Sequence, residues 1–388
     1  MMPVRSYTFA WERPHYTRPA GKKCFQHIEG DMKLIVTIDT EEDNWARYHP
    51  TENPVTNIQE IAGLQKLLDE FGVKPTYVVT YPVATHPNSI HILKRILEEG
   101  KCEIGMHCHP WNTPPFDKSA EILEQDTMLC NLSPESQHAK LTELHQAISD
   151  NFGKAPVSFR TGRWGFGKTV GESLCRLGFR SDSSVTPYLS WKHYRGPDYS
   201  NYGPEPFWLA PGNRLHHKAD VLLEVPTTVG FLQPNFSLCH RLLTLAEKPV
   251  PRKMHIPGIL YRLRMLNMVW LSPEQSDAKQ MIRLATRMEK AEYKVLNLTF
   301  HSTALLAGLS PFVRTGKEKQ SFLMRLRAFL VFARKSGYES LTLAEFEEHV
   351  RKTRSVRLNT RQFEDSRFIE GAGCSSIIRQ ISGLPEEN

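Results

Sequence analysis

Residues 32–43 read MKLIVTIDTEED, and this stretch decides the fold. Its apolar part, residues 33–39, predicts a buried β-strand. Four acidic residues follow within five positions: Asp39, Glu41, Glu42 and Asp43. Such acids repel one another unless a cation or an arginine neutralises them. The stretch predicts carboxylates at the C-terminal edge of a parallel sheet, where α/β enzymes keep their active sites. The alternative is an acidic helix N-terminus with no special role.

Apolar runs alternate with amphipathic patterns over the rest of the chain. Residues 57–71 place Ile, Leu and other apolar side chains on one stripe and end at Gly72, which predicts a helix. The alternation predicts an α/β fold with a parallel sheet. Seven or eight strand–helix units in about 320 residues fit a closed or nearly closed (β/α) barrel. The other predicted strands are 76–80, 102–107, 157–160, 180–184, 221–229, 294–300 and 339–343, and the other helices are 89–99, 133–151, 168–177, 272–292 and 317–335.

The 388 residues divide into one barrel domain, residues 32–353, and two flanking segments. Residues 1–31 are polar and aperiodic. We expect a loosely attached or mis-started extension there, or else an edge segment packed on the fold. Residues 186–220 and 230–271 are rich in Pro, Tyr and Trp, and we expect long irregular insertions around the mouth of the barrel. Residues 354–388 are expected to form a weakly ordered tail.

Composition excludes several classes of protein. The net charge of +7 is mild and its basic residues are spread along the chain, so we expect no nucleic-acid partner. Seven cysteines without a CxxC pair indicate free thiols in a reducing compartment. No run approaches the roughly 18–20 apolar residues of a membrane span. The N-terminus lacks the apolar region of a signal peptide, so we expect a cytoplasmic protein.

A second strand ends in two histidines. Residues 102–107 lead into His107-Cys108-His109-Pro110-Trp111. His107 and His109 are two positions apart, so on an extended chain they point to one face and Cys108 to the other. Two imidazoles beside a carboxylate favour a zinc-type site that keeps coordination positions open for water.

Residues 158–169 read SFRTGRWGFGKT and allow two interpretations. Residues 162–169 match the phosphate-binding pattern GxxxxGK[ST], in which Lys168 and Thr169 would hold phosphate and magnesium. The context disfavours this interpretation, because the preceding strand is short and ends in Arg160. In addition, Arg163 and Trp164 are too bulky for a loop that wraps closely round phosphate.

Two later strands carry single polar residues. In LNLTFHS, residues 296–302, a strand ends at His301, and a histidine there can act as general acid or base. In LLEVPT, residues 222–227, Glu224 lies inside an apolar strand. This carboxylate is either paired or faces the pocket, and we include it among the candidate substrate-binding residues.

Taken in order, these segments resemble the polysaccharide deacetylase family, carbohydrate esterase family four, with its NodB-type homology domain. The resemblance covers roughly residues 33–345, and is greatest to the branch that reads IDTEE, HxHPW-TPPF and FR-GRWG. These motifs stand here at residues 38–42, 107–116 and 159–165. The resemblance implies a distorted (β/α) barrel of seven or eight strands and a divalent metal, zinc or cobalt, held by one carboxylate and two histidines.

The resemblance also implies roles for individual residues. Asp39 matches the general base and Arg160 the arginine that tethers it. His301 matches the acid that protonates the leaving amine. Trp164 matches an aromatic residue of the substrate groove, where we also expect Trp111 and Arg163.

The metal ligands depart from the usual family pattern. The family places a ligand aspartate directly after the base, where this chain has Thr40. The carboxylate ligand then comes from Glu41, Glu42 or Asp43, and Glu41 is favoured because it returns to the same face. The usual pattern has three residues between the two histidines, which would place the second at residue 111, whereas here it is His109.

These observations predict a hydrolase that removes acetyl groups from N-acetylated sugars of a polysaccharide or its precursor. Two alternatives stay open. One is a small-molecule hydrolase of C–N bonds, as in the allantoinase-like branch of the same fold. The other is a non-catalytic glycan-binding relative.

Overall fold

The structure is a computed structural model that describes residues 31–357, apart from residue 46 and residues 117–121, 211–220, 249 and 251–252. Most of the predicted extension at residues 1–31 and of the predicted tail at 354–388 lies outside the described residues. No described helix is both long and apolar enough to cross a membrane.

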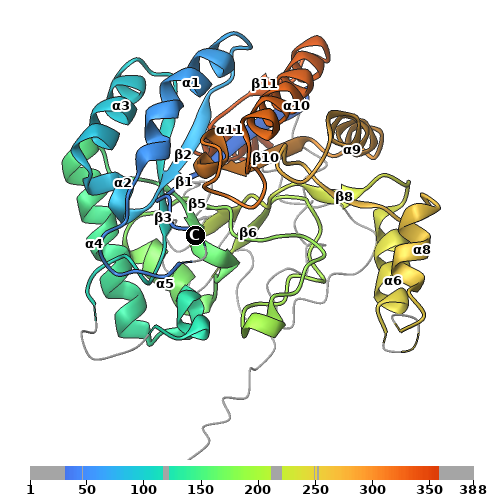
Figure 1. Cartoon of the computed structure of the whole chain (residues 1–388), viewed down its shortest axis with the longest axis horizontal. Coiled ribbons are helices and arrows are strands. Elements are labelled where there is room, and N and C mark those ends of the chain that lie inside the picture. Colours follow the sequence, from blue (N-terminus) through green and yellow to red (C-terminus); the bar gives the residue numbers. More distant parts are fainter. Residues whose placement is uncertain are drawn as a thin grey trace, which may run out of the picture.

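Parallel strands form the centre of the molecule (Figure 1). Seven of them follow the order β10-β1-β2-β3-β4-β5-β7, and β6 pairs antiparallel with β7 at one edge. A short strand, β11, pairs with the start of β1. The bounds are β1 Lys33–Thr40, β2 Pro75–Val79, β3 Glu103–Cys108, β4 Ser158–Thr161, β5 Ser181–Asp182, β6 Phe207–Leu209, β7 Leu222–Glu224, β10 Val295–His301 and β11 Glu339–Ser340.

A few backbone hydrogen bonds connect the two edges of the sheet and nearly close it into a barrel. Thr228 follows β7 in the sequence, and its amide donates to the carbonyl of Asn297 in β10 at 3.1 Å. Leu271 joins this seam, because its amide donates to Thr228 and its carbonyl accepts from Thr299. Beside the seam lies a two-stranded sheet of β8, Val229–Phe231, and β9, Met268–Trp270. The predicted distorted (β/α) barrel of seven to eight strands is confirmed.

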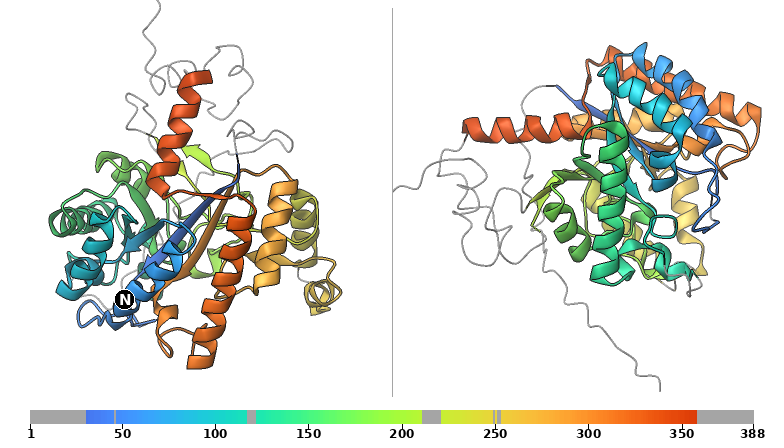
Figure 2. Two further views of the ribbon diagram at one scale, coloured as in Figure 1. Left: turned by 90° about the horizontal axis from the view of Figure 1, so that it is seen from above. Right: turned by 90° about the vertical axis from the view of Figure 1, so that its left-hand side faces the viewer.

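Helices cover the outside of the sheet on several sides (Figure 2). Their ends follow local sequence signals: Ser133 caps α4, which ends at Gly153 in the left-handed conformation. The bounds are α1 Ile61–Asp69, α2 Tyr81–Thr85, α3 Pro87–Glu98, α4 Pro134–Phe152, α5 Lys168–Arg176, α6 Phe236–Ala246, α8 Ile256–Arg262, α9 Ala278–Lys290, α10 Gly316–Lys335 and α11 Leu343–Arg357.

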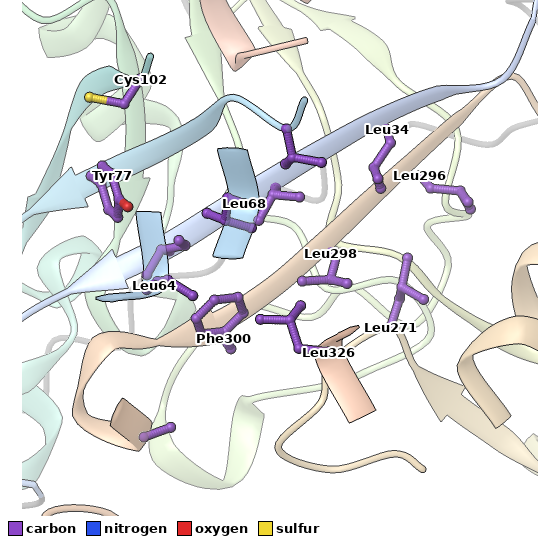
Figure 3. Close-up of a cluster of buried hydrophobic side chains, with 14 of the residues drawn as sticks. Leu34, Leu64, Leu68, Tyr77, Cys102, Leu271, Leu296, Leu298, Phe300 and Leu326 are labelled. Atoms are coloured by element: carbon purple, nitrogen blue, oxygen red, sulfur yellow. The ribbon is translucent and has the colours of Figure 1, made fainter. Parts of the chain in front are cut away.

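The alternation of side chains along β1 divides the interior in two. Leu34, Val36 and Ile38 belong to the large apolar core (Figure 3), which they share with residues of the covering helices such as Leu64. Ile35 belongs instead to a small cluster with Phe346 and other residues of α11. Thr37 and Asp39 point to the same face of β1 as Ile35, and both accept hydrogen bonds from the buried Arg160. The same alternation therefore builds the outer core and supplies the site.

Two predictions about chain segments were wrong in part. Residues 230–271, predicted to be irregular, contain α6 and α8 between β8 and β9. The predicted helix over residues 272–292 begins only at Ala278, because Asp277 caps it in a capping box with Gln280. Residues 271–276 are consequently free to enter the site as a loop.

Candidate active site

The ends of four strands, β10, β1, β3 and β4, meet at the candidate site. In the sheet register Asp39 of β1 is opposite His301 of β10, and His107 of β3 is opposite Arg160 of β4. All four lie at or near the C-terminal ends of parallel strands. The sequence therefore placed these residues on the correct edge of the sheet.

Three buried side chains bring one ligand atom each to a common point. These are Glu41, His107 and His109. The Nε2 atoms of the two histidines are 3.1 Å apart. Glu41 Oε2 is 3.4 Å from Nε2 of His109 and 4.0 Å from Nε2 of His107. Ligands of a tetrahedral ion at about 2.1 Å are separated by about 3.4 Å, so the three atoms fit one divalent cation such as zinc.

The far nitrogen of each histidine is held by a second group. His107 Nδ1 lies 3.0 Å from the backbone carbonyl of Arg160, and His109 Nδ1 lies 2.8 Å from Glu42 Oε1. A carbonyl only accepts, so the His107 ring donates from Nδ1 and keeps a lone pair on Nε2. Such outer hydrogen bonds fix the tautomer and orientation of metal-binding histidines.

Electrostatics within this group favour a positive charge at its centre. Burial lowers the pKa of His107 to about 3, so its ring is neutral. Burial opposes charge on His109 as well, but Glu42 outweighs it and raises the pKa of that imidazole. Burial, reinforced by Glu42 and Asp39, raises the pKa of Glu41 to about 7 against the opposing effect of His301 and His109. A proton or a metal ion among the three ligand atoms relieves the repulsion between their lone pairs.

Beside this group a carboxylate is tethered by a buried arginine. Arg160 Nη1 donates to Asp39 Oδ1 at 2.5 Å. Burial alone would raise the pKa of Asp39, but the charges of Arg160 and His301 lower it, so Asp39 is an anion. The other Arg160 N–H groups donate to Ser183, Thr299 and Thr37, so all five guanidinium donors are used.

His301 faces the same carboxylate and is held from behind. Its Nε2 lies 3.7 Å from Asp39 Oδ2, and its Nδ1 lies 3.0 Å from Glu274 Oε2. Burial disfavours the charged ring, but Glu274, Glu41 and Asp39 outweigh it and raise the pKa of His301 to about 10. His301 is therefore an imidazolium at neutral pH, and its side chain keeps 21% of its surface exposed. It can donate a proton to a bound molecule.

Three of the four candidate substrate-binding residues, Trp111, Trp164 and Arg163, lie near the site. Trp111 stacks on His109 with ring centroids 4.1 Å apart. Trp164 lies over Arg160 at 5.5 Å, and Arg163 donates to Tyr48 and Thr127. The buried ring of Trp111, the partly exposed ring of Trp164 and the cation of Arg163 therefore lie near the candidate site.

Glu224 lies beneath this level and is fully buried. Its Oε1 accepts from the Val185 amide at 3.0 Å. Burial and the neighbouring Asp182 raise the pKa of Glu224 well above its usual range, so its carboxyl is protonated. Of the two interpretations left by the sequence, the structure favours a paired group.

The loop that follows β4 packs against the histidines. A Cβ on Gly162 would lie 2.4 Å from Cδ2 of His109, and one on Gly165 would lie 2.9 Å from Cβ of Met128. Arg163 and Trp164 both have positive φ, 51° and 61°, a conformation that bulky residues rarely adopt. Gly162, the first glycine of the GxxxxGK[ST] pattern, thus provides close packing for His109, and Gly165, which stands at a variable position of the pattern, does so for Met128.

The contacts of three residues near the site were not anticipated. Glu42 and Glu274 orient histidines, and the ring of Trp45 lies edge-on to His301 at 4.8 Å. Glu42 stood among the alternatives for a ligand, and only the spacing in MKLIVTIDTEED pointed to it. Glu274 was assigned to a helix, so its approach to His301 was hidden. Asp43 caps the next turn through Thr56 and Asn57.

Comparison with known proteins gives a likeness of fold. No protein-family profile matches the sequence, and no curated protein sequence is similar to it. A structure from Parabacteroides distasonis, described as a proposed glycoside hydrolase/deacetylase, matches with a TM-score of 0.51 at 12% identity, over 84% of this chain and 73% of that chain. A structure from Mycobacterium smegmatis, described as a proposed polysaccharide deacetylase, matches with a TM-score of 0.46 at 18% identity, over 83% and 92%. The chain has the deacetylase-like barrel fold, so the predicted resemblance is confirmed at the level of the fold.

Proposed function

We propose that this protein is a metal-dependent hydrolase that removes acetyl groups from N-acetylated sugars of a polysaccharide or its precursor. One observation carries the proposal. Glu41, His107 and His109 converge on one point, with Asp39 and His301 beside it. A ligand group next to a base and an acid is what hydrolysis of an amide requires.

The ligand group and its neighbours divide the work. A divalent cation, zinc or cobalt, held by Glu41, His107 and His109 would supply a Lewis acid that polarises the acetamide carbonyl and acidifies water. Asp39 accepts the proton of the attacking water. Arg160 holds Asp39 at 2.5 Å and keeps the carboxylate ionised until then.

His301 completes the reaction on the other side of Asp39. The amine that leaves an amide must be protonated, and His301 carries a proton at neutral pH. Glu274 fixes the ring so that Nε2 faces Asp39 at 3.7 Å. The ring of Trp45 covers one edge of His301.

Aromatic side chains at the site favour a sugar as substrate. Trp45 and Trp164 are partly buried, and Trp270 lies 5.5 Å from Trp164. Such rings offer flat apolar surfaces beside polar groups, which suits the faces and hydroxyl groups of a pyranose. Arg163, between Tyr48 and Tyr194, offers a cation at the same rim.

Acetate release from a panel of N-acetylated saccharides tests the proposal. The metal-loaded protein should release acetate without producing new reducing ends, since the proposal breaks amide and not glycosidic bonds. Asp39→Asn and His301→Ala should each lower kcat at least a hundredfold with an unchanged circular dichroism spectrum. Leu123→Ser, at an exposed position, serves as the control that keeps full rate.

Other outcomes would decide against the proposal. Near-normal turnover in either catalytic variant would show that the assigned roles are wrong. Release of reducing ends would indicate a glycosidase. Release of ammonia or urea from small C–N substrates, without acetate from saccharides, would favour the small-molecule alternative.

A further inference from the structure

A pair of helices stands at the edge of the molecule between β8 and β9. In Figures 1 and 2, α6 and α8 lie together, away from the centre of the barrel. One side of α6 packs inward through Phe236, Cys239 and Ala246, which are buried. We call residues 236–265 the α6–α8 segment.

The outward side of this segment is apolar. Leu238, Leu242 and Leu245 follow one another at spacings of four and three, so they form one stripe along α6. Each is about half exposed, at 49%, 47% and 53%. The helix is therefore apolar on two faces, only one of which is covered by the barrel.

Exposed apolar side chains concentrate in this segment. Among the described residues eleven large hydrophobic side chains are exposed, and nine belong to the α6–α8 segment. Leu123 and Met324 are the two outside it. Single exposed hydrophobics are normal on a soluble surface, but a cluster of this kind marks an interaction site. The nine are Leu238, Leu242, Leu245, Val250, Met254, Ile259, Tyr261, Leu263 and Met265.

The same segment concentrates positive charge. It contains six lysines and arginines and a single acidic residue, Glu247, which gives a net charge of +5, against +7 for the whole chain. The spread of basic residues expected from composition therefore fails here. Within the described part of the chain the charges are exposed, and no ion pair involves them: Arg241, Lys248, Lys253, Arg262 and Arg264.

We propose that the α6–α8 segment docks on the surface of an anionic phospholipid bilayer. An interfacial helix inserts apolar side chains at the level of the headgroups while lysines and arginines meet the lipid phosphates. Here both kinds of side chain are interleaved on α6, α8 and the residues beside them, and acidic residues are nearly excluded.

Charge argues against a second copy of the chain as the occupant. A symmetric dimer through this surface would bring two segments of charge +5 face to face. Such like-charge contact opposes association, whereas anionic lipid attracts the segment. The bilayer is therefore the occupant that satisfies the apolar and the cationic side chains together.

Ring contacts connect α6, and the strand that follows the α6–α8 segment, to loops of the barrel. Tyr188, on the loop after β5, lies 5.1 Å from His240 of α6. Trp270, at the end of β9, lies 5.5 Å from Trp164 of the site. A bilayer bound at α6 and α8 would thus lie beside elements that carry the mouth of the barrel. The proposal rests on the exposed residues alone and not on the proposed reaction.

Flotation of the full-length protein with lipid vesicles tests the docking. Vesicles of phosphatidylcholine with phosphatidylglycerol should carry the protein upward, and vesicles of phosphatidylcholine alone should not. High salt should release it, because surface charge is screened. The double variant Leu242→Glu/Leu245→Glu should reduce the bound fraction at least tenfold. The double variant Arg241→Glu/Arg262→Glu should weaken the affinity for vesicles about fivefold or more for each arginine replaced. Asp39→Asn should bind like wild type, which separates this test from catalysis.

Met324→Glu is the matched control. Met324 is 65% exposed on α10 and lies outside the segment, so its variant should float as wild type does. Failure of the wild-type protein to float with anionic vesicles would overturn the proposal. Equal loss in Met324→Glu would overturn it too, since binding would then not depend on the segment. A dimer in light scattering that Leu242→Glu/Leu245→Glu dissociates, without vesicle binding, would assign the surface to protein association instead.

Discussion

At the scale of single residues, the site is built from pairs in which one side chain fixes another. Glu42 holds His109, Arg160 holds Asp39, and Glu274 holds His301 at 3.0 Å. In each pair the partner is buried, so its electrostatic effect is weakly screened. The protonation and orientation of His109, Asp39 and His301 therefore depend on the charge of the buried partner that holds each of them.

In the proposed reaction the pair of His301 and Glu274 should set an alkaline limit to activity. His301 is the proposed acid, so activity should be present while it is protonated and should be lost as pH rises through its pKa of about 10. Glu274→Gln keeps the shape but removes the charge, so the pKa falls and the alkaline limb should move about one pH unit or more toward neutrality. The pH profile of kcat/KM measures this shift. An unmoved alkaline limb would mean that Glu274 does not control the acid.

The position of the His109 ring depends on the absence of a side chain at Gly162. Its missing side chain leaves room for the ring, because a Cβ would lie 2.4 Å from Cδ2. Gly162→Ala should displace the imidazole and weaken metal affinity about 10- to 100-fold, the range found when groups supporting a ligand are lost. Competition with a chelator of known affinity measures the change. Gly63→Ala, where the added atom meets nothing, is the control that should leave affinity unchanged.

The sequence predicted the residues that face the centre of the site better than it predicted Glu274, which orients one of them. Asp39, His107 and His301 stand at strand ends, where an apolar run meets a polar residue, and a sequence displays that boundary. Glu274 comes from a loop after β9 that is remote from His301 by 27 positions. Long-range pairing of this kind leaves no local pattern.

At the scale of elements, capping decides where the loop of Glu274 ends and α9 begins. The Asp277 side chain accepts from the Gln280 amide at 2.8 Å, and the Gln280 side chain accepts in return from the Asp277 amide. The apolar and helix-forming residues before it favoured a helix from residue 272. The cap outweighs that preference and frees residues 271–276.

Removal of this cap should cost about 1 kcal/mol. We expect Asp277→Ala to lower the free energy of unfolding by that amount, since the Gln280 amide loses its side-chain acceptor. Asp277→Asn retains an accepting oxygen and should remain close to wild type. Denaturation in urea measures both variants. Equal stability of the alanine variant and wild type would show that packing of α9, and not its cap, fixes the start of the helix.

The α6–α8 segment shows why irregularity was predicted there. Its prolines and its apolar residues on both faces of α6 do not give the one-sided stripe that identifies a helix on a barrel. The inward face, Phe236 and Cys239, packs on the barrel, while the outward face remains exposed. The lost periodicity was therefore itself a sign of a second contact surface.

At the scale of the whole molecule, the side chains inside the barrel change from apolar at one end to polar and then charged at the site. Ile35 and Phe346 lie in the small apolar cluster with α11, Thr37 and Asn297 form hydrogen bonds in the middle, and Asp39 lies at the site. The order of strand–helix units let the sequence predict the barrel. The near-closure through Thr228 and Asn297 was not predictable, because single hydrogen bonds between irregular segments follow no sequence period.

We propose that Glu41, His107 and His109 hold one divalent ion. Metal analysis of the purified protein by mass spectrometry tests it most directly. The account predicts about one zinc or cobalt ion per chain, and less than about a tenth of that in His107→Ala and in Glu41→Ala. A protein that carries no divalent metal after exposure to zinc, or variants that retain it in full, would contradict the account.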